Sequence, residues 1–176
     1  MLRKMSYEEI LALAPKLEDI KAKKKRPIVI IVDNIRSLHN VGAILRTADA
    51  AGVERVYLCG LTGTPPRSEI RKTSLGAEDA VAWEYYKNIS VPIQHLKLKG
   101  YKIVVLEHTS GSVDFQKAQY KFPLCLVVGH EHYGVSEEVV QQADLAIEIP
   151  MYGIKQSLNV SVAFGIAIYE IIRSLE

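Results

Sequence analysis

The 176-residue sequence has few cysteines, no long apolar run and almost no net charge. Its two cysteines, Cys59 and Cys125, each lie inside an apolar run, which favours buried thiols in reducing cytosol over a disulfide or a metal site. The longest apolar-rich stretch, residues 158–172, is too short to span a bilayer, and the N-terminus lacks the apolar core of a signal peptide. We therefore expect a cytoplasmic protein with no membrane partner.

The near-neutral charge hides an asymmetry along the chain. In total, 22 basic and 20 acidic side chains give a net charge of +2. Residues 1–26 hold eight basic and four acidic side chains, a net of +4, whereas the remaining 150 residues hold 14 and 16, a net of −2. The excess gathers in residues 21–26, a tract that is either a solvated surface or a contact for nucleic-acid phosphates.

The pattern of apolar residues alternates between strands and helices. Continuous β-branched or apolar runs predict strands at residues 27–32, 55–59, 102–106, 124–128 and 145–149. Three- and four-residue apolar spacing predicts helices at residues 6–21, 39–51, 90–99, 136–142 and 158–174. This alternation predicts an α/β fold with a mostly parallel sheet flanked by helices. We expect one domain over residues 26–176, preceded by an amphipathic helix and basic tract in residues 1–25.

The expected last helix is apolar on nearly every side. Val160, Phe164 and Ile168 belong to one stripe, while Val162 and Ile166 make the other side apolar as well. A helix of this kind must be covered on both sides. Because the domain is small, one side would meet the sheet and the other a second subunit, so we expect a homodimer.

Polar residues and glycines gather in three segments where a strand ends or a helix begins. In residues 33–47, Asn40 lies near a helix start, where its amide could cap free N–H groups. Arg46, on the helix that follows, is either a salt-bridged arginine or a guanidinium that grips a phosphate or polarises a hydroxyl.

The second segment, residues 127–136, follows a buried strand directly. Gly129 and Gly134 permit a tight loop at the carboxyl end of that strand, where open α/β sheets place ligands. Glu131 between them fits a hydrogen-bond acceptor for a ligand or for a neighbouring loop. His130 and His132 could indicate a metal, but no further ligand stands at suitable spacing, so we expect none.

The third segment, residues 149–159, leads into the last helix. Ser157 and Asn159 are each suited to cap that helix. Both also stand at the mouth of a loop that would face the second segment if the strand order brings the two together. The sequence has none of the fingerprints of dinucleotide-binding proteins, nucleoside triphosphatases or serine hydrolases. Spacing alone therefore predicts a site built from loops and does not indicate which reaction takes place there.

Together the three segments resemble the SpoU–TrmH family of RNA ribose 2′-O-methyltransferases, in the trefoil-knotted SPOUT class. The matching stretches are NVGAILRTADAAG at residues 40–52, VGHEHYGVS at 128–136 and IPMYGIKQSLNVSVA at 149–163. They occur in family order and at family spacing, over about residues 26–174. The sequence departs from the pattern at His130, where many relatives have asparagine, and the resemblance assigns that position no role.

The resemblance implies a C-terminal trefoil knot whose loops cradle S-adenosylmethionine, and a dimer with sites near its interface. The residues it implies for cofactor binding are Leu106, Glu107, Gly129, Ile149, Met151, Ser157 and Leu158. Arg46 would be the catalytic arginine, with Asn40, Glu131 and Asn159 ordering the site around it. Because arginine is very hard to deprotonate, we expect Arg46 to hold a phosphate and stabilise charge on the ribose oxygen rather than to act as a base.

We expect no separate RNA-binding module beside the matching region, so RNA would be held by basic side chains near it. The candidates are Lys23, Lys24, Lys25, Arg26, Arg36, Arg67, Arg71 and Lys72, the last three in residues 62–76, which we expect to form a mobile surface loop. The predicted function is S-adenosylmethionine-dependent methylation of a ribose 2′-hydroxyl in structured tRNA or rRNA. The alternative is a non-catalytic RNA-binding or assembly module on the same fold.

Overall fold

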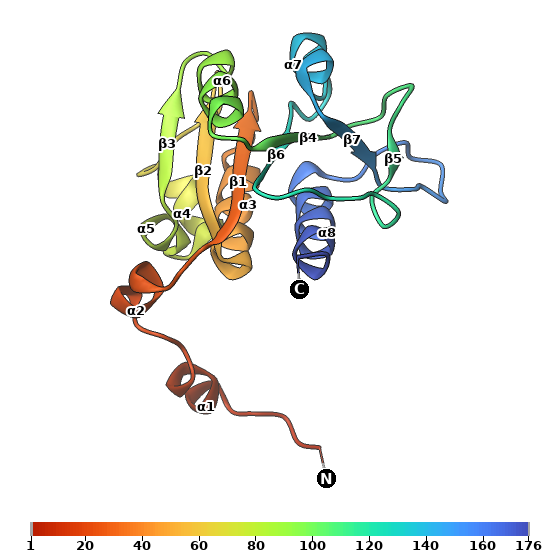
Figure 1. Cartoon of the computed structure of the whole chain (residues 1–176). Coiled ribbons are helices and arrows are strands. Elements are labelled where there is room, and N and C mark those ends of the chain that lie inside the picture. The colour runs from red at the N-terminus through yellow and green to blue at the C-terminus, as the bar shows by residue number, and fades with distance from the viewer. Residues whose placement is uncertain (1, 176) are drawn as a thin grey trace.

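The computed structural model describes residues 2–175, and within them seven parallel strands form one sheet. The order across the sheet is β3-β2-β1-β6-β4-β7-β5 (Figure 1). β1 pairs in parallel with β2 and β6, and β4 pairs with β6 and β7, so the carboxyl ends of these strands lie along one edge. The strands are β1 Arg26–Asp33, β2 Val53–Cys59, β3 Trp83–Tyr86, β4 Lys102–Leu106, β5 Val113–Asp114, β6 Leu124–Val128 and β7 Leu145–Glu148.

Helices cover both faces of the sheet. Successive side chains of β1 point to opposite faces, and each set packs in a different core. Ile28 and Ile30 belong to a core shared with α3 (Leu38–Ala51), α4 (Ser68–Ser74) and α8 (Val160–Arg173), beside which lies α5 (Ala77–Ala80). Val29 and Ile31 belong to a second core, shared with α6 (Ser90–Leu98) and α7 (Glu137–Gln142). The predicted α/β class and flanking helices are confirmed.

The two cysteines lie in the second core as buried free thiols, as the sequence predicted. Burial raises the pKa of the Cys59 thiol to about 12, with a further contribution from Asp33. Burial likewise raises the pKa of Cys125 well above its usual value. Both side chains therefore stay neutral and act as small apolar groups.

The single helix predicted over residues 6–21 is wrong. The chain forms two short helices instead, α1 (Tyr7–Ala12) and α2 (Leu17–Ala22), and Pro15 lies in the break between them. Proline has no N–H and its ring clashes with the preceding turn, so it overrides the apolar spacing. Neither helix has a buried residue, and Figure 1 shows them extending away from the sheet. The division at residue 25 stays a prediction.

The mobile loop predicted for residues 62–76 is also wrong, because its second half forms α4. Ile70 is fully buried against the core, and the Thr73 hydroxyl donates a hydrogen bond of 3.0 Å to the His39 carbonyl on α3. Gly42 makes this contact possible, since a Cβ there would lie 2.3 Å from the Ile70 carbonyl oxygen. The segment is thus fixed against α3.

The remaining differences are small edge elements that the sequence pattern did not indicate. β3 and β5 are outer strands of four and two residues, and α5 is a single turn. The trefoil knot implied by the resemblance stays a prediction. Among residues 2–175, no helix is both long and apolar enough to cross a membrane.

Candidate active site

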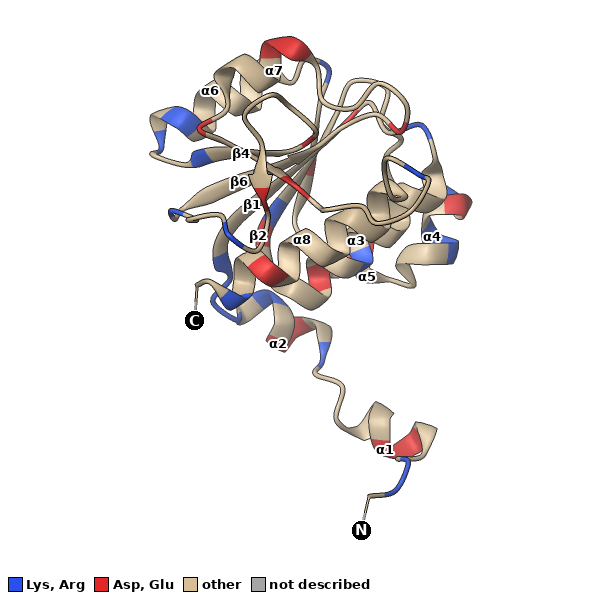
Figure 2. Ribbon diagram, turned by 90° about the vertical axis from the view of Figure 1, so that its right-hand side faces the viewer, with Lys and Arg blue, Asp and Glu red and all other residues tan. Residues whose placement is uncertain are grey.

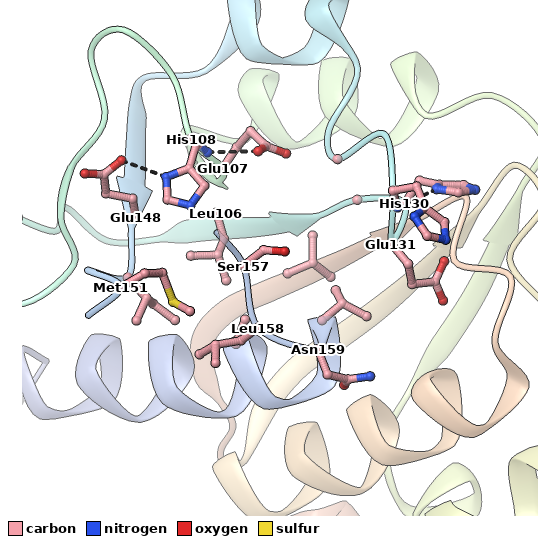
Figure 3. Close-up of a pocket in the computed structure, with 17 residues that line it drawn as sticks. Leu106, Glu107, His108, His130, Glu131, Glu148, Met151, Ser157, Leu158 and Asn159 are labelled. Carbon is pink, nitrogen blue, oxygen red and sulfur yellow. Dashed lines mark hydrogen bonds and ion pairs between the residues drawn. The ribbon is translucent and has the colours of Figure 1, made fainter. Parts of the chain in front are cut away.

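A cavity of about 230 Å³ lies where β4, β6 and β7 end, as Figure 3 shows. Leu106 and Glu107 follow β4, the glycine loop follows β6, and residues 149–159 connect β7 to α8. The structure places every residue that the resemblance implied for cofactor binding on its wall: Leu106, Glu107, Gly129, Ile149, Met151, Ser157 and Leu158.

The loop after β6 is closed by its two glycines. His130 and Gly134 exchange backbone hydrogen bonds of 3.0 and 2.8 Å, so the chain reverses tightly between them. Gly134 has a positive φ of 64°, which favours glycine. At Gly129 a Cβ would lie 2.3 Å from the Gly134 carbonyl oxygen. The Glu107 carboxylate then anchors the loop by accepting a 2.8 Å hydrogen bond from the Val135 N–H.

A chain of hydrogen bonds joins Glu131, Asn40 and Asn159, which are far apart in sequence. Glu131 accepts a 3.1 Å bond from the Asn40 side-chain amide, and the Asn40 oxygen accepts one of 3.1 Å from the Asn159 amide. Asn159 also caps α8, because its oxygen accepts a 3.0 Å bond from the Ser161 N–H. The three candidate residues thus form one polar cluster, of which Glu131 and Asn159 line the cavity.

The Glu131 carboxylate also holds the loop that precedes α3. It accepts hydrogen bonds from the backbone N–H groups of Ser37, at 3.1 Å, and Arg36, at 3.3 Å. Partial burial alone would raise the pKa of Glu131, but these bonds and the Asn40 amide outweigh it, so the pKa lies below its usual value. Glu131 is therefore an ionised acceptor that orders the site and a poor proton acceptor for the reaction.

The expectation that Asn40 caps α3 is wrong. Ser37 is the capping residue, and its hydroxyl accepts a 3.3 Å hydrogen bond from the Asn40 N–H. Asn40 is the third residue of α3, in its first turn, and its side-chain amide is free to connect Glu131 with Asn159.

Arg46 does not join this cluster within one chain. Six residues of α-helix turn by about 600° and rise about 9 Å, so Arg46 and Asn40 lie on different sides of α3. Arg46 is exposed and lines a separate hollow together with Lys72 on α4 and Tyr169 on α8. Neither a salt bridge nor a contact with Glu131 or Asn159 forms at Arg46 among residues 2–175.

The candidate RNA-binding side chains differ in how freely they are presented. Lys23, Lys24, Arg36, Arg67 and Lys72 are exposed, and Lys25 is half-buried. Figure 2 shows basic segments along α2 and α4. Two of the arginines have protein partners: Arg26 donates a 3.0 Å hydrogen bond to the Ala51 carbonyl at the end of α3, and Arg71 lies 3.5 Å from Glu78 and 3.7 Å from Asp79.

His108 and Glu148 line the cavity but were missed by the sequence reasoning (Figure 3). His108 Nδ1 lies 3.0 Å from Glu148 Oε2, and Nε2 lies 2.9 Å from the Gln156 carbonyl oxygen. Both partners accept, so both ring nitrogens carry protons when both bonds are made. The resulting imidazolium clasps the loop of residues 149–159 to β7. The partners of His108 lie 40 and 48 residues away along the chain, so no local sequence pattern indicates these contacts.

We predict that this clasp makes cofactor affinity depend on pH. The hydrogen bond to Glu148 raises the pKa of His108 above its usual value of 6.5. The clasp is therefore complete below that value and is lost as pH rises through the raised pKa. Calorimetry between about pH 6 and pH 9 should show affinity for S-adenosylmethionine falling with pH in the wild type. His108→Asn should bind more weakly at low pH and lack this component; equal pH profiles would contradict the prediction.

The histidines after β6 are engaged within their own turn. His130 Nδ1 accepts hydrogen bonds from the His132 N–H at 3.0 Å and the Tyr133 N–H at 3.4 Å, and its ring lies 4.8 Å from that of Tyr133. Over the described part of the chain, no group of three or more His, Cys, Asp or Glu side chains is placed to hold a metal ion.

Comparisons with known proteins agree with this geometry. The model of the SpoU rRNA Methylase family matches residues 27–169. The tRNA (guanosine(18)-2′-O)-methyltransferase of Aquifex aeolicus is 37% identical over 175 residues, which cover 98% of this chain and 81% of that one. The crystal structure of the A. aeolicus TrmH/SpoU tRNA modifying enzyme superposes with a TM-score of 0.81 at 37% identity, covering 90% of this chain and 81% of that one.

A further solved structure bears on the cofactor. The AdoMet-bound rRNA methyltransferase from Sinorhizobium meliloti superposes with a TM-score of 0.80 at 32% identity, over 92% of this chain and 61% of that one. The fold and the loop-built cavity thus define an S-adenosylmethionine-dependent RNA methyltransferase. More narrowly, the chain belongs to the SpoU rRNA Methylase family of ribose 2′-O-methyltransferases.

The cavity suits this cofactor in both its apolar lining and its charge. Leu106, Ile149 and Leu158 give it apolar walls that fit an adenine ring. The carboxylates of Glu107, Glu131 and Glu148 also line it, which favours a cationic ligand, and S-adenosylmethionine carries a sulfonium and an ammonium group.

Proposed function

We propose that this enzyme methylates the ribose 2′-hydroxyl of a guanosine in structured tRNA or rRNA. The observation that carries the proposal is the cluster of Asn40, Glu131 and Asn159, which joins the three matching segments at the rim of the cofactor cavity. The named relatives support the substrate class, since one modifies guanosine in tRNA and another modifies rRNA.

The reaction needs a methyl donor and an oriented hydroxyl. When bound, S-adenosylmethionine supplies an electrophilic methyl group on its sulfonium. Leu106, Gly129, Ile149, Met151, Ser157 and Leu158 would surround it, and Glu107 would keep the loop after β6 in place. Asn40 and Asn159 would fix the position of the ribose, with Glu131 holding Asn40.

Arg46 would act on the RNA side of the reaction. A guanidinium stays protonated in proteins, so it is suited to bind the adjacent phosphate and to stabilise negative charge that develops on the ribose oxygen. Lys72 shares its hollow and adds a second positive charge for a phosphate. Basic side chains of residues 23–26, together with Arg36, Arg67 and Arg71, would extend this contact over a folded RNA.

The enzyme would work as a homodimer through the outer face of α8. This face exposes an apolar patch made of Val162, Ile166 and Tyr169, which are 51%, 39% and 53% exposed. Exposed apolar patches of this kind mark sites where another protein binds. Tyr169 borders the hollow of Arg46, so this contact would place Arg46 at the subunit interface. A site completed by two chains would explain why Arg46 lies outside the cluster of its own chain. We expect the dimer to act in the cytoplasm.

We predict that Ile166→Asp breaks the dimer. A charge at the centre of an apolar interface should raise the dimer dissociation constant at least about 30-fold, as measured by analytical ultracentrifugation, and methyl transfer should fall in parallel. The matched control is Val91→Asp, at a residue 53% exposed on α6 across the sheet. Unchanged sedimentation of Ile166→Asp would rule out this interface.

The proposed function is tested by methylation with labelled S-adenosylmethionine. Total tRNA and total rRNA are incubated separately with the enzyme, and the labelled position is mapped as a 2′-O-methyl group. We expect uptake into one pool, at a guanosine. Label on a base, or no uptake into either pool, would contradict the proposal.

A further inference from the structure

A second hollow, of about 660 Å³, lies beside the cofactor cavity. The two share His130 and Gly134, so only the turn after β6 separates them. The second hollow is otherwise lined by residues at the carboxyl ends of β1 and β2 and by the start of α7. The mechanism described above uses no side chain in this hollow apart from Arg36.

Asp33 on its wall is a carboxylate with spare hydrogen-bonding capacity. The residue is only 3% exposed, and its Oδ1 accepts a 3.0 Å hydrogen bond from the Asn34 side-chain amide. Asn34 is itself fixed, because its oxygen accepts a 3.0 Å bond from the Leu61 N–H. No residue among 2–175 donates to Asp33 Oδ2. Burial raises the pKa of Asp33, and the single Asn34 bond does not offset that effect.

Asp33 Oδ2 is not among the buried unpartnered atoms of the described residues, so it keeps contact with solvent in the hollow and can accept a hydrogen bond from a ligand that supplies N–H groups. The hollow also has two large exposed side chains, Leu61 and Tyr133. Leu61 is 74% exposed and Tyr133 is 87% exposed. Flat apolar and aromatic surfaces of this kind are what unstacked RNA bases contact. Arg36, exposed and also on the wall, suits a phosphate.

We propose that this hollow binds the guanine base of the nucleotide being methylated, with Asp33 accepting its N1–H and 2-amino N–H. The inference rests on the proposed function and adds the group that selects the base. Guanine is the RNA base that presents two adjacent donors on its Watson–Crick edge. Adenine and cytosine place a ring acceptor beside the amino group, and uracil has one donor between two acceptors, so each would set a lone pair against the carboxylate.

The position of the hollow agrees with this assignment. One nucleotide would place its ribose at the cofactor cavity and its base across the turn that the two spaces share. Tyr133 would stack on the base, and the bonded chain from Leu61 through Asn34 would keep Asp33 in one orientation.

The test uses RNA transcripts with guanosine, inosine or adenosine at the mapped position, inosine lacking the 2-amino group. The wild type should prefer guanosine to inosine at least about tenfold in kcat/KM. Asp33→Asn should reduce transfer to guanosine about 10- to 100-fold and remove that preference, while affinity for S-adenosylmethionine is unchanged. A tenfold preference retained by Asp33→Asn, or absent from the wild type, would overturn the pocket.

A second variant keeps the test decisive if Asp33→Asn fails to fold, as its melting temperature would reveal. Tyr133→Ala should raise KM for the guanosine transcript at least about fivefold without changing cofactor affinity, and Tyr133→Phe should restore it. An unchanged KM in Tyr133→Ala would overturn the pocket. Absence of transfer to any transcript by the wild type would instead reject the proposed function on which the pocket rests.

Discussion

Arg46→Ala is expected to lower the rate of methyl transfer about 100- to 1000-fold, the usual cost of removing a charged donor that stabilises a transition state. Affinity for S-adenosylmethionine should be unchanged, because Arg46 lies outside the cofactor cavity. Single-turnover transfer from labelled cofactor measures the first effect, and calorimetry measures the second. Arg46→Lys should recover little, because an ammonium cannot form the paired hydrogen bonds of a guanidinium.

The matched control for Arg46 is Arg55→Ala. Arg55 on β2 forms an ion pair with Glu84 on β3 and lines neither the cofactor cavity nor the hollow of Arg46, and exposed ion pairs contribute little to stability. Its variant should keep wild-type transfer and affinity. If Arg46→Ala kept near-normal turnover, the assignment of the arginine would fail.

Gly129→Ala is expected to have the opposite profile, with loss of cofactor binding as the primary defect. The added Cβ would lie 2.3 Å from the Gly134 carbonyl oxygen and 2.4 Å from the Val135 nitrogen, both of them backbone atoms that cannot rotate away. The loop must open, which displaces a wall of the cavity. We expect the free energy of unfolding to fall by about 1–3 kcal/mol, and binding of S-adenosylmethionine to become undetectable by calorimetry.

Gly153→Ala is the control for that substitution. Gly153 lies in the loop between β7 and α8, and a Cβ there meets nothing within 4 Å. This variant should melt and bind like the wild type. Wild-type affinity in Gly129→Ala would show that the loop tolerates the methyl group and that its tight closure is unnecessary for binding.

The central strands could be predicted because burial on both faces requires apolar residues at successive positions. β1, β4 and β6 are buried on both faces, so each is a continuous apolar run. α4 was missed because its stability comes from contact with other elements: of its residues only Ile70 and Ser74 are buried, and the backbone of Ile70 approaches α3 closely because Gly42 there has no Cβ. Pro15 shows the converse, since a single residue broke a helix that apolar spacing supported.

The candidate site was predictable to the extent that its residues lie in the three matching segments. Asn40, Glu131 and Asn159 meet as the resemblance implied, whereas Arg46 lies apart from them because of its rotation around α3. His108 and Asp33 lie outside the three matching stretches, 40–52, 128–136 and 149–163. Their contacts form only when β1, β4 and β7 take their places in the sheet, and local sequence patterns do not predict that strand order.

The hydrogen bond between Asn40 and Asn159 spans 119 residues and also joins the first turn of α8 to the first half of the chain. During synthesis, this bond cannot form until α8 has left the ribosome and docked. Fraying of the first turn of α8 would release Asn159 from Asn40 and detach Leu158 and Val160 from the cavity in the same event. The Ser161 N–H donates to the Asn159 oxygen, so we expect amide exchange at Ser161 to report the opening of this turn and, with it, of the cofactor cavity.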